Sequence, residues 1–307
     1  MRISTPENAI SLLSNAIVLS GSARSGTTIT GKILHSFHNV EYLYEPPIIF
    51  TLLALRNKIG EDEFKAIYGS YLYDEFLVNS IAGRAINCNI HDDSSIYNVK
   101  SKQEVSSRLR RKNTKIGNES IESTYQIAYK ANSIIPFIPF IQKIYPSTKV
   151  IITLRGPIGV INSILRKEWF SKKNNEMNFS IPFRQKKGVN IPFWVKKNHD
   201  DVWIELSEID RAAYYYIQTY DGIENFSQYN FIRYTELISN PVNVVENLAD
   251  SLNLDFGAKT KSIISTIRPT VIDRDIAIIS KISQEFRNRL KDLMDFTEND
   301  QINITSY

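Results

Sequence analysis

Residues 16–34 place an apolar run, a polar loop and a helical pattern in immediate succession. The run at residues 16–19 predicts a buried strand, and apolar side chains recur at spacings of three and four from Ile29 onward. Gly21 and Gly26 bound the loop and leave room for a ligand to approach the backbone. Since the first amides of a helix lack intrahelical partners and its dipole favours an anion, the pattern predicts a phosphate-binding loop.

The position of the cation distinguishes this loop from nucleoside triphosphate P-loops. Those loops read G-x-x-x-x-G-K-[ST], whereas Thr27 stands at the lysine position here and Arg24 supplies a cation earlier. The sequence Arg24-Ser25-Gly26-Thr27-Thr28 resembles the 5′-phosphosulfate loop of sulfotransferases that use 3′-phosphoadenosine 5′-phosphosulfate (PAPS). An ordinary glycine-containing turn between strand and helix is the alternative. The resemblance implies that the donor contacts Ser22, Ala23, Arg24, Ser25, Gly26, Thr27 and Thr28.

A second segment decides between these two interpretations. Val150–Leu154 is a continuous apolar run, typical of a parallel strand covered on both faces. Arg155 follows at its carboxyl end, where ligands bind in doubly wound sheets, and Ser163 lies about two turns into the next helix. This spacing resembles the 3′-phosphate-binding segment of the same sulfotransferases, with Gly156 in place of the family's Asp. The resemblance implies that Arg155 and Ser163 bind the 3′-phosphate.

A general base for the acceptor is the next requirement. Tyr44-Glu45-Pro46 resembles the Glu-Pro segment of carbohydrate sulfotransferases, which implies that Glu45 is the base and Arg24 the catalytic cation. Glu45 could instead pair with Arg24 or cap the helix that begins at Pro47. Weaker candidates for the base are His35, His38, His199 and Glu168.

The last matching segment begins at Tyr234, in Tyr-Thr-Glu-Leu followed by Pro241. It resembles the family's Tyr-Glu-Asp-Leu segment, whose tyrosine lies near the adenine, and so implies that Tyr234 contacts the nucleotide. The Arg-Lys-Gly segment of cytosolic sulfotransferases is missing from the sequence, and Arg268 or Arg274 could replace it. Its absence favours the carbohydrate or bacterial branches of the family over the enzymes that act on small phenols or steroids.

The predicted fold is an α/β, P-loop-type three-layer sandwich with a central parallel sheet of four to five strands flanked by helices. We expect one domain over residues 1–307, with the second strand beside the first, a helix over 121–131 and a single long helix over 202–226. The expected strands are 16–19, 40–44, 115–117, 150–154 and 230–233.

Residues 166–199 combine many cations with interleaved aromatic residues. The segment is interpreted either as a solvated insertion or as a substrate-side insertion that covers an anionic or sugar acceptor. The cations are Arg166, Lys167, Lys172, Lys173, Arg184, Lys186, Lys187, Lys196 and Lys197, and the aromatic residues are Trp169, Phe170, Phe183, Phe193 and Trp194.

Composition limits the class of protein. With 42% hydrophobic and 23% charged residues the chain is typical of a globular protein, and a net charge of +4 is too small to indicate a nucleic-acid partner. Cys88 is the only cysteine, and no apolar segment reaches the roughly 20 residues of a membrane span. A cytoplasmic protein is therefore expected.

His91-Asp92-Asp93 has no second ligand cluster nearby, so it is interpreted as an exposed turn and no metal site is predicted.

These segments together predict a PAPS-dependent sulfotransferase that modifies a hydroxyl or amine, with a saccharide or polysaccharide as acceptor. The product of the donor would be adenosine 3′,5′-bisphosphate, and the scheme needs no metal. One alternative is a P-loop nucleotide kinase-like phosphotransferase, which would use ATP and Mg²⁺. The other is a non-catalytic adenosine bisphosphate-binding protein, which would lack a base near the sulfate.

Overall fold

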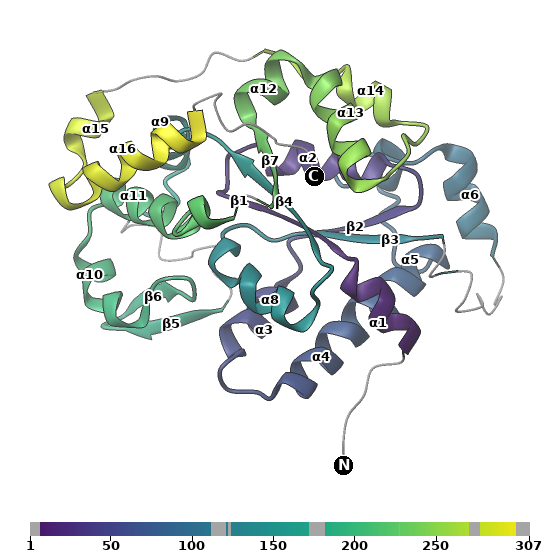
Figure 1. Ribbon diagram of the computed structural model, residues 1–307, viewed down its shortest axis with the longest axis horizontal. Coiled ribbons are helices and arrows are strands. Elements are labelled where there is room, and N and C mark those ends of the chain that lie inside the picture. Colours follow the sequence, from purple (N-terminus) through teal and green to yellow (C-terminus); the bar gives the residue numbers. More distant parts are fainter. Residues whose placement is uncertain are drawn as a thin grey trace.

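A five-stranded parallel sheet runs through the centre of the molecule, in the order β2-β3-β1-β4-β7 (Figure 1). The computed structural model describes residues 7–111, 121, 124–171, 182–226, 228–269 and 277–298. The strands are β1 (Ile17–Gly21), β2 (Val40–Tyr44), β3 (Gln126–Lys130), β4 (Lys149–Leu154) and β7 (Asn230–Arg233). The predicted α/β fold with a central parallel sheet is thus confirmed.

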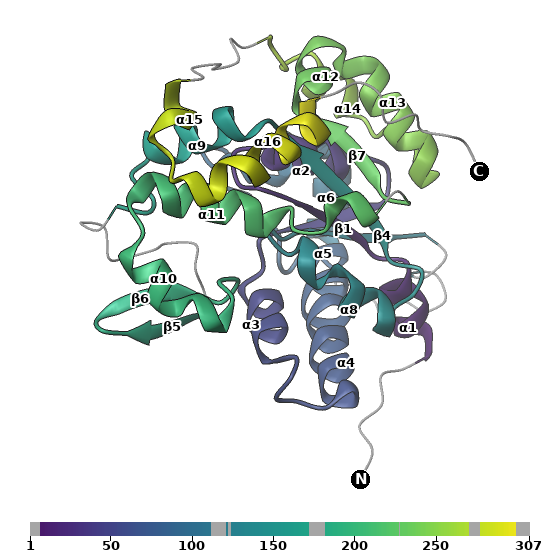
Figure 2. The ribbon, with the colours of Figure 1, turned by 60° about the vertical axis from the view of Figure 1, so that its left-hand side comes forward.

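Helices cover both faces of the sheet (Figures 1 and 2). Because side chains alternate along a strand, Ile17 and Leu19 of β1 face one layer and Val18 faces the other. The first layer contains α2 (Thr27–Ser36), α12 (Tyr234–Ser239), α13 (Pro241–Leu252) and α14 (Thr260–Ile264). The second contains α1 (Glu7–Ser14), α3 (Pro47–Leu55), α4 (Glu61–Gly69), α8 (Ile138–Ile144), α9 (Pro157–Leu165), α11 (Glu208–Thr219) and α16 (Gln284–Glu298).

Strand β3 is the main departure from the predicted elements. The helix expected over residues 121–131 is wrong, since Gln126–Lys130 forms a strand that pairs with both β1 and β2. We expected strand β2 to lie beside β1, but in the structure its neighbour is β3. Periodicity cannot separate a short apolar run from a buried helix, and Ile127–Tyr129 is such a run, buried on both faces. The strand predicted at 115–117 lies outside the described residues.

The helix expected over 202–226 is also divided. It consists of α10 (Asp200–Glu205), a break at Leu206, and α11, whose N-cap Ser207 accepts a hydrogen bond from the Asp210 amide. The shorter helical elements are η1 (Ser70–Val78), α5 (Asn79–Ile81), η2 (Ile96–Asn98), α6 (Lys102–Arg110), η3 (Ile135–Phe137), η4 (Lys197–His199), η5 (Ile223–Asn225) and α15 (Ala277–Lys281).

The hairpin β5 (Phe183–Lys186) and β6 (Val189–Pro192) belongs to the segment 166–199 and lies beside α10, apart from the central sheet (Figure 2). That residues 1–307 form one domain stays a prediction. Of the helices that the structure describes, none is long and apolar enough to cross a bilayer.

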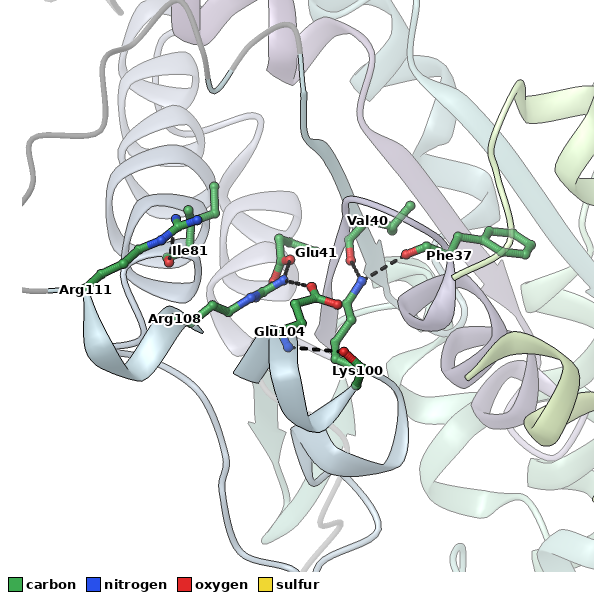
Figure 3. A network of polar contacts seen from close by, with 9 residues as sticks. Phe37, Val40, Glu41, Ile81, Lys100, Glu104, Arg108 and Arg111 are labelled. Carbon is green, nitrogen blue, oxygen red and sulfur yellow. Dashed lines mark hydrogen bonds and ion pairs between the residues drawn. The ribbon is translucent and has the colours of Figure 1, made fainter. Parts of the chain in front are cut away.

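The edge strand β2 is fixed by a buried network of charges that joins it to α6 (Figure 3). Arg108 of α6 donates to both carboxylate oxygens of Glu41, at 2.9 and 2.6 Å, and to Glu104 at 2.6 Å. Lys100 donates to the carbonyls of Phe37 and Val40, each at 2.9 Å. Glu41 and Arg108 are almost fully buried, so each would be costly to bury without the other.

Candidate active site

The loop between β1 and α2 leaves the start of α2 open. Gly26 precedes the helix with φ 92°, and no side chain within the described part of the protein caps the helix there. The first amides of α2 can therefore bind an anion. A Cβ at Gly26 would lie 2.9 Å from the Tyr234 ring, so the close approach and the backbone conformation both require glycine.

Tyrosines of α11 hold the loop from behind. The amide of Ser22 donates to the Tyr220 hydroxyl at 3.1 Å, and the amide of Ala23 donates to the Tyr215 hydroxyl at 2.7 Å. Burial raises the pKa of Tyr215 to about 12, which keeps this hydroxyl neutral. The Ser25 hydroxyl donates to the Ser22 carbonyl at 2.6 Å. Ser22, Ala23 and Ser25, which were predicted to contact PAPS, thus form hydrogen bonds within the protein that shape the loop.

Arg24 joins the loop to the second predicted segment. Its Nε donates to the Ser163 hydroxyl at 2.9 Å, while Arg155 donates to the Arg24 carbonyl at 2.7 Å. The Arg155 guanidinium lies 4.5 Å from the centroid of the Tyr234 ring. Arg24, Arg155, Ser163 and Tyr234 therefore meet at the carboxyl edge of the sheet. The register explains this, because Gly21 of β1 pairs with Thr153 of β4 beside them.

Lys130 is a site residue that the sequence analysis missed. Strand β3 ends at Lys130, which pairs in register with Tyr44, so the side chain emerges beside Glu45. The Lys130 ammonium lies 3.0 Å from the Glu45 carboxylate, 3.5 Å from the Thr28 hydroxyl and 3.8 Å from the centroid of the Tyr44 ring. It is buried, and Asn132 also donates to Glu45. Glu45 thus pairs with Lys130 and not with Arg24, and no side-chain bond from it caps α3.

The signal for Lys130 was its place directly after the short apolar run Ile127–Tyr129, with Asn132 two residues further on. Interpreted as a strand, this run would have placed both side chains at a carboxyl strand end, where ligands bind. Because a helix was expected over residues 121–131, Lys130 and Asn132 were not recognised as residues at the end of a strand.

A cavity of about 260 Å³ lies between the loop, the start of α3 and the segment 166–199. Its polar and charged lining includes Arg24, Thr27 and Thr28 of the loop, together with Glu45 and Lys130. Much of the rest of the lining is an aromatic wall that consists of Tyr44, Pro47, Phe50, Trp169, Phe193 and Trp194. The described residues of 166–199 that reach the cavity are therefore all aromatic.

The cations of the segment 166–199 lie elsewhere. Arg184 pairs with Asp200, and Lys186 lies 2.7 Å from Asp201. Lys196 pairs with Asp221 at 3.1 Å. None of the described cations of this segment lines the cavity, so the expectation of a cationic cover over an anionic acceptor gains no support. Lys172 and Lys173 lie outside the described residues.

The other candidates for the base lie away from the cavity. His35 is buried in α2, and burial, with Lys100 and Arg108 nearby, holds its pKa well below the usual range. The His199 ring nitrogen contacts the Tyr214 hydroxyl at 2.9 Å. Neither these residues nor His38 or Glu168 lines the cavity.

The remaining predicted features lie on the surface. Arg268 is exposed and bonds to the Ser265 carbonyl, and Arg274 is outside the described residues. His91, Asp92 and Asp93 form an exposed turn. Among residues 7–111 and the other described ranges, no group of three or more His, Cys, Asp or Glu side chains could hold a metal ion.

A family model and several solved structures are similar to this chain. The sulfotransferase family model matches residues 16–258. The chain is similar to the sulfotransferase domain of the olefin synthase from Synechococcus PCC 7002 (16% identity, TM-score 0.47, covering 93% of this chain and 95% of that one). It is also similar to the sulfotransferase domain from the curacin biosynthetic pathway (15%, TM-score 0.44, 95% and 93%) and to sulfotransferase STF1 from Mycobacterium tuberculosis H37Rv (13%, TM-score 0.43, 94% and 78%). Comparison with curated proteins finds no match. The family match spans the loop and all five strands of the sheet.

Proposed function

Since the chain belongs to the sulfotransferase family, we propose that it transfers a sulfuryl group from PAPS to an acceptor hydroxyl or amine. The observation that carries this proposal is the bond of Arg24 to Ser163 beside the open start of α2, with Glu45 and Lys130 lining the same cavity. Cations, an anion-binding helix start and a carboxylate are thus collected at one edge of the sheet. That combination suits transfer of an anionic group to a hydroxyl.

The residues present fit a nucleotide with two phosphate positions. The first amides of α2 and the hydroxyls of Thr27 and Thr28 would hold the 5′-phosphosulfate. Arg155 would hold the 3′-phosphate, since a guanidinium can form paired bonds to phosphate oxygens. The Tyr234 ring, with its centroid 4.5 Å from the Arg155 guanidinium, would support the nucleotide on that side. Ser163 would serve either Arg24 or the 3′-phosphate.

Glu45 and Lys130 would carry the chemistry on the acceptor side. When bound, PAPS supplies the sulfuryl group, whose bond to the phosphate oxygen breaks as the acceptor oxygen bonds to sulfur. Glu45 takes the acceptor proton, and Arg24 and Lys130 stabilise negative charge on the oxygens around the transferred group. Lys130 is suited to this task because its buried ammonium lies between the Glu45 carboxylate and Thr28.

The acceptor class and the compartment also stay proposals. Taken alone, the Glu-Pro resemblance implies a saccharide or polysaccharide acceptor. The single cysteine, Cys88, supports a reducing compartment such as the cytoplasm, since the sequence can form no intramolecular disulfide.

Calorimetry with adenosine 3′,5′-bisphosphate, AMP and ATP with Mg²⁺ tests the donor. We expect the bisphosphate to bind at least about tenfold more tightly than AMP, because a hydrogen bond to a charged group contributes roughly 1.5–3 kcal/mol. Arg155→Ala should remove that difference, whereas Arg289→Ala, in a surface ion pair with Glu224, should leave it unchanged. Equal affinity for the bisphosphate and AMP would sink the proposal, and tight ATP binding that needs Mg²⁺ would favour a kinase-like enzyme. Binding without any sulfate transfer would favour a non-catalytic protein.

A further inference from the structure

Each charged side chain of the described cavity lining already has a role in the proposed sulfuryl transfer. Among the described lining residues, Arg24 and Lys130 are the cations and Glu45 is the acid. If the proposed function holds, both cations face the sulfuryl group and Glu45 faces the acceptor hydroxyl. The described lining then offers no further cation to a carboxylate or sulfate on the acceptor. An anionic acceptor would have to lose its hydration without an opposite charge, which is costly.

The wall that remains is aromatic and is held in place by packing. The ring of Phe193 lies 6.0 Å from that of Phe50 and 5.6 Å from that of Phe137. Trp194 contacts the rings of Tyr215 at 5.1 Å and Trp203 at 5.3 Å. These rings come from α3, η3, α10, α11 and the segment after β6, so the wall is fixed from several sides. A fixed aromatic wall favours a flat apolar ligand.

Two of the polar side chains that line the cavity are already bonded within the protein. Ser133 donates its hydroxyl proton to Tyr215 at 2.7 Å, and the Asn132 amide donates to Glu45. A sugar ring carries several hydroxyls, each of which loses water on binding and needs a new partner. The lining therefore suits an acceptor with few polar groups besides the one that is sulfated.

The size of the cavity sets a further limit. A cavity of about 150 Å³ holds benzene, and this one has about 260 Å³. That volume accommodates one ring together with the group being transferred, but not several sugar units within the cavity.

Resting on the proposed function, we infer that the acceptor is a small uncharged phenol or alcohol whose hydroxyl is attached to a flat apolar ring. The ring lies against the aromatic wall at Phe50, Phe193 and Trp194, and its hydroxyl points to Glu45. Transfer joins the acceptor oxygen to sulfur, releases adenosine 3′,5′-bisphosphate and gives the proton to Glu45. An acidic polysaccharide would bring carboxylates or sulfates for which the described lining offers no further cation.

Four acceptors test the inference: 4-methylphenol, 4-hydroxybenzoate, methyl glucoside and chondroitin. With labelled PAPS, we expect kcat/KM for 4-methylphenol to exceed that for each of the others at least tenfold. The comparison with 4-hydroxybenzoate tests mainly charge. Methyl glucoside replaces the flat apolar ring by a hydroxylated ring, and chondroitin adds size and negative charge. Equal or faster transfer to any of the other three would overturn the inference.

Variants test the wall itself. Phe50→Ala and Phe193→Ala should raise KM for 4-methylphenol about tenfold or more while calorimetry shows unchanged affinity for adenosine 3′,5′-bisphosphate. Phe183→Ala is the matched control, because Phe183 belongs to the same segment, is 51% exposed and does not line the cavity. An unchanged KM in both wall variants contradicts the inference.

The acceptor and donor assignments can fail separately. If the bisphosphate binds but 4-methylphenol is neither bound nor sulfated, the acceptor inference is wrong and the donor proposal stands. The opposite result is also possible to distinguish. If calorimetry shows that 4-methylphenol binds and that Phe193→Ala weakens this binding, the aromatic wall is a binding site for an apolar ring. If the bisphosphate does not bind in the same experiments, the proposed function fails.

Discussion

At the scale of single residues, the pair of Glu45 and Lys130 is the most informative contact. A carboxylate 3.0 Å from a buried ammonium could be a purely structural ion pair or a base beside an electrostatic catalyst. Its place in the lining of the cavity, with Thr28 3.5 Å from the ammonium, favours the second interpretation. Glu45 also has a φ of 44°, a conformation that non-glycine residues adopt rarely and that is often found at functional sites.

Glu45→Gln separates these interpretations because it keeps the shape and the bond to Lys130 but removes the base. We expect kcat to fall about 10²- to 10⁴-fold, the usual contribution of general base catalysis. Affinity for adenosine 3′,5′-bisphosphate and the melting temperature should be nearly unchanged. Steady-state kinetics with the best acceptor, calorimetry and thermal unfolding measure the three quantities.

Lys130→Met is the companion variant. It should lower kcat as well, since charge on the sulfuryl oxygens loses a stabilising cation, and it should leave Glu45 partly buried without its partner. A structural ion pair would instead lower stability in both variants and spare kcat in Glu45→Gln. That pattern would reassign the base.

At the scale of elements, the sequence predicted well wherever a local pattern sufficed. Strands β1, β2, β4 and β7 were expected within a residue or two, and the position of Arg155 at a strand end followed from the run before it. Strand β3 was missed because its identity depends on burial between two other strands, which no local pattern encodes. Lys130 was missed for the same reason, and the aromatic wall was only an alternative, because its rings come from elements far apart in the sequence.

The loop itself offers a prediction with a close control. Gly26→Ala should weaken binding of adenosine 3′,5′-bisphosphate by about tenfold or more. Its new methyl group would meet the Tyr234 ring at 2.9 Å, at the amides where the phosphate binds, and a side chain is disfavoured at φ 92°. Gly188→Ala carries a similar backbone cost at φ 75° in the hairpin turn, with nothing within 4 Å of the added methyl. The cost of the backbone alone is roughly 1 kcal/mol of stability.

Calorimetry and thermal unfolding on both glycine variants distinguish the two effects. Loss of stability in both, with loss of binding confined to Gly26→Ala, is the expected result. Equal bisphosphate affinity in the two variants would show that this loop does not bind the phosphate.

At the scale of the whole molecule, the sheet must hold its edge strand in place, because β2 carries Tyr44 and Glu45 to the cavity and has a neighbour on one side only. The buried contact of Glu41 with Arg108 provides this hold (Figure 3). Lys100 adds bonds to carbonyls at the end of α2 and the start of β2. The buried charge pair of Glu41 and Arg108 thus helps to hold Glu45 in position at the cavity.

Arg108→Met should therefore destabilise the protein by about 3–5 kcal/mol, since Glu41 would stay buried without its cation. The double variant Glu41→Leu with Arg108→Met should recover most of that loss, because no unpaired carboxylate remains. Arg289→Met, which breaks an exposed arginine–carboxylate pair, is the matched control and should cost at most about 1 kcal/mol. Chemical or thermal unfolding of the wild type and the three variants measures the differences in stability.

If Arg108→Met unfolds as readily as Arg289→Met, or if the double variant is no more stable than Arg108→Met alone, then the buried pair does not anchor β2. The position of Glu45 must in that case depend on its bonds to Lys130 and Asn132.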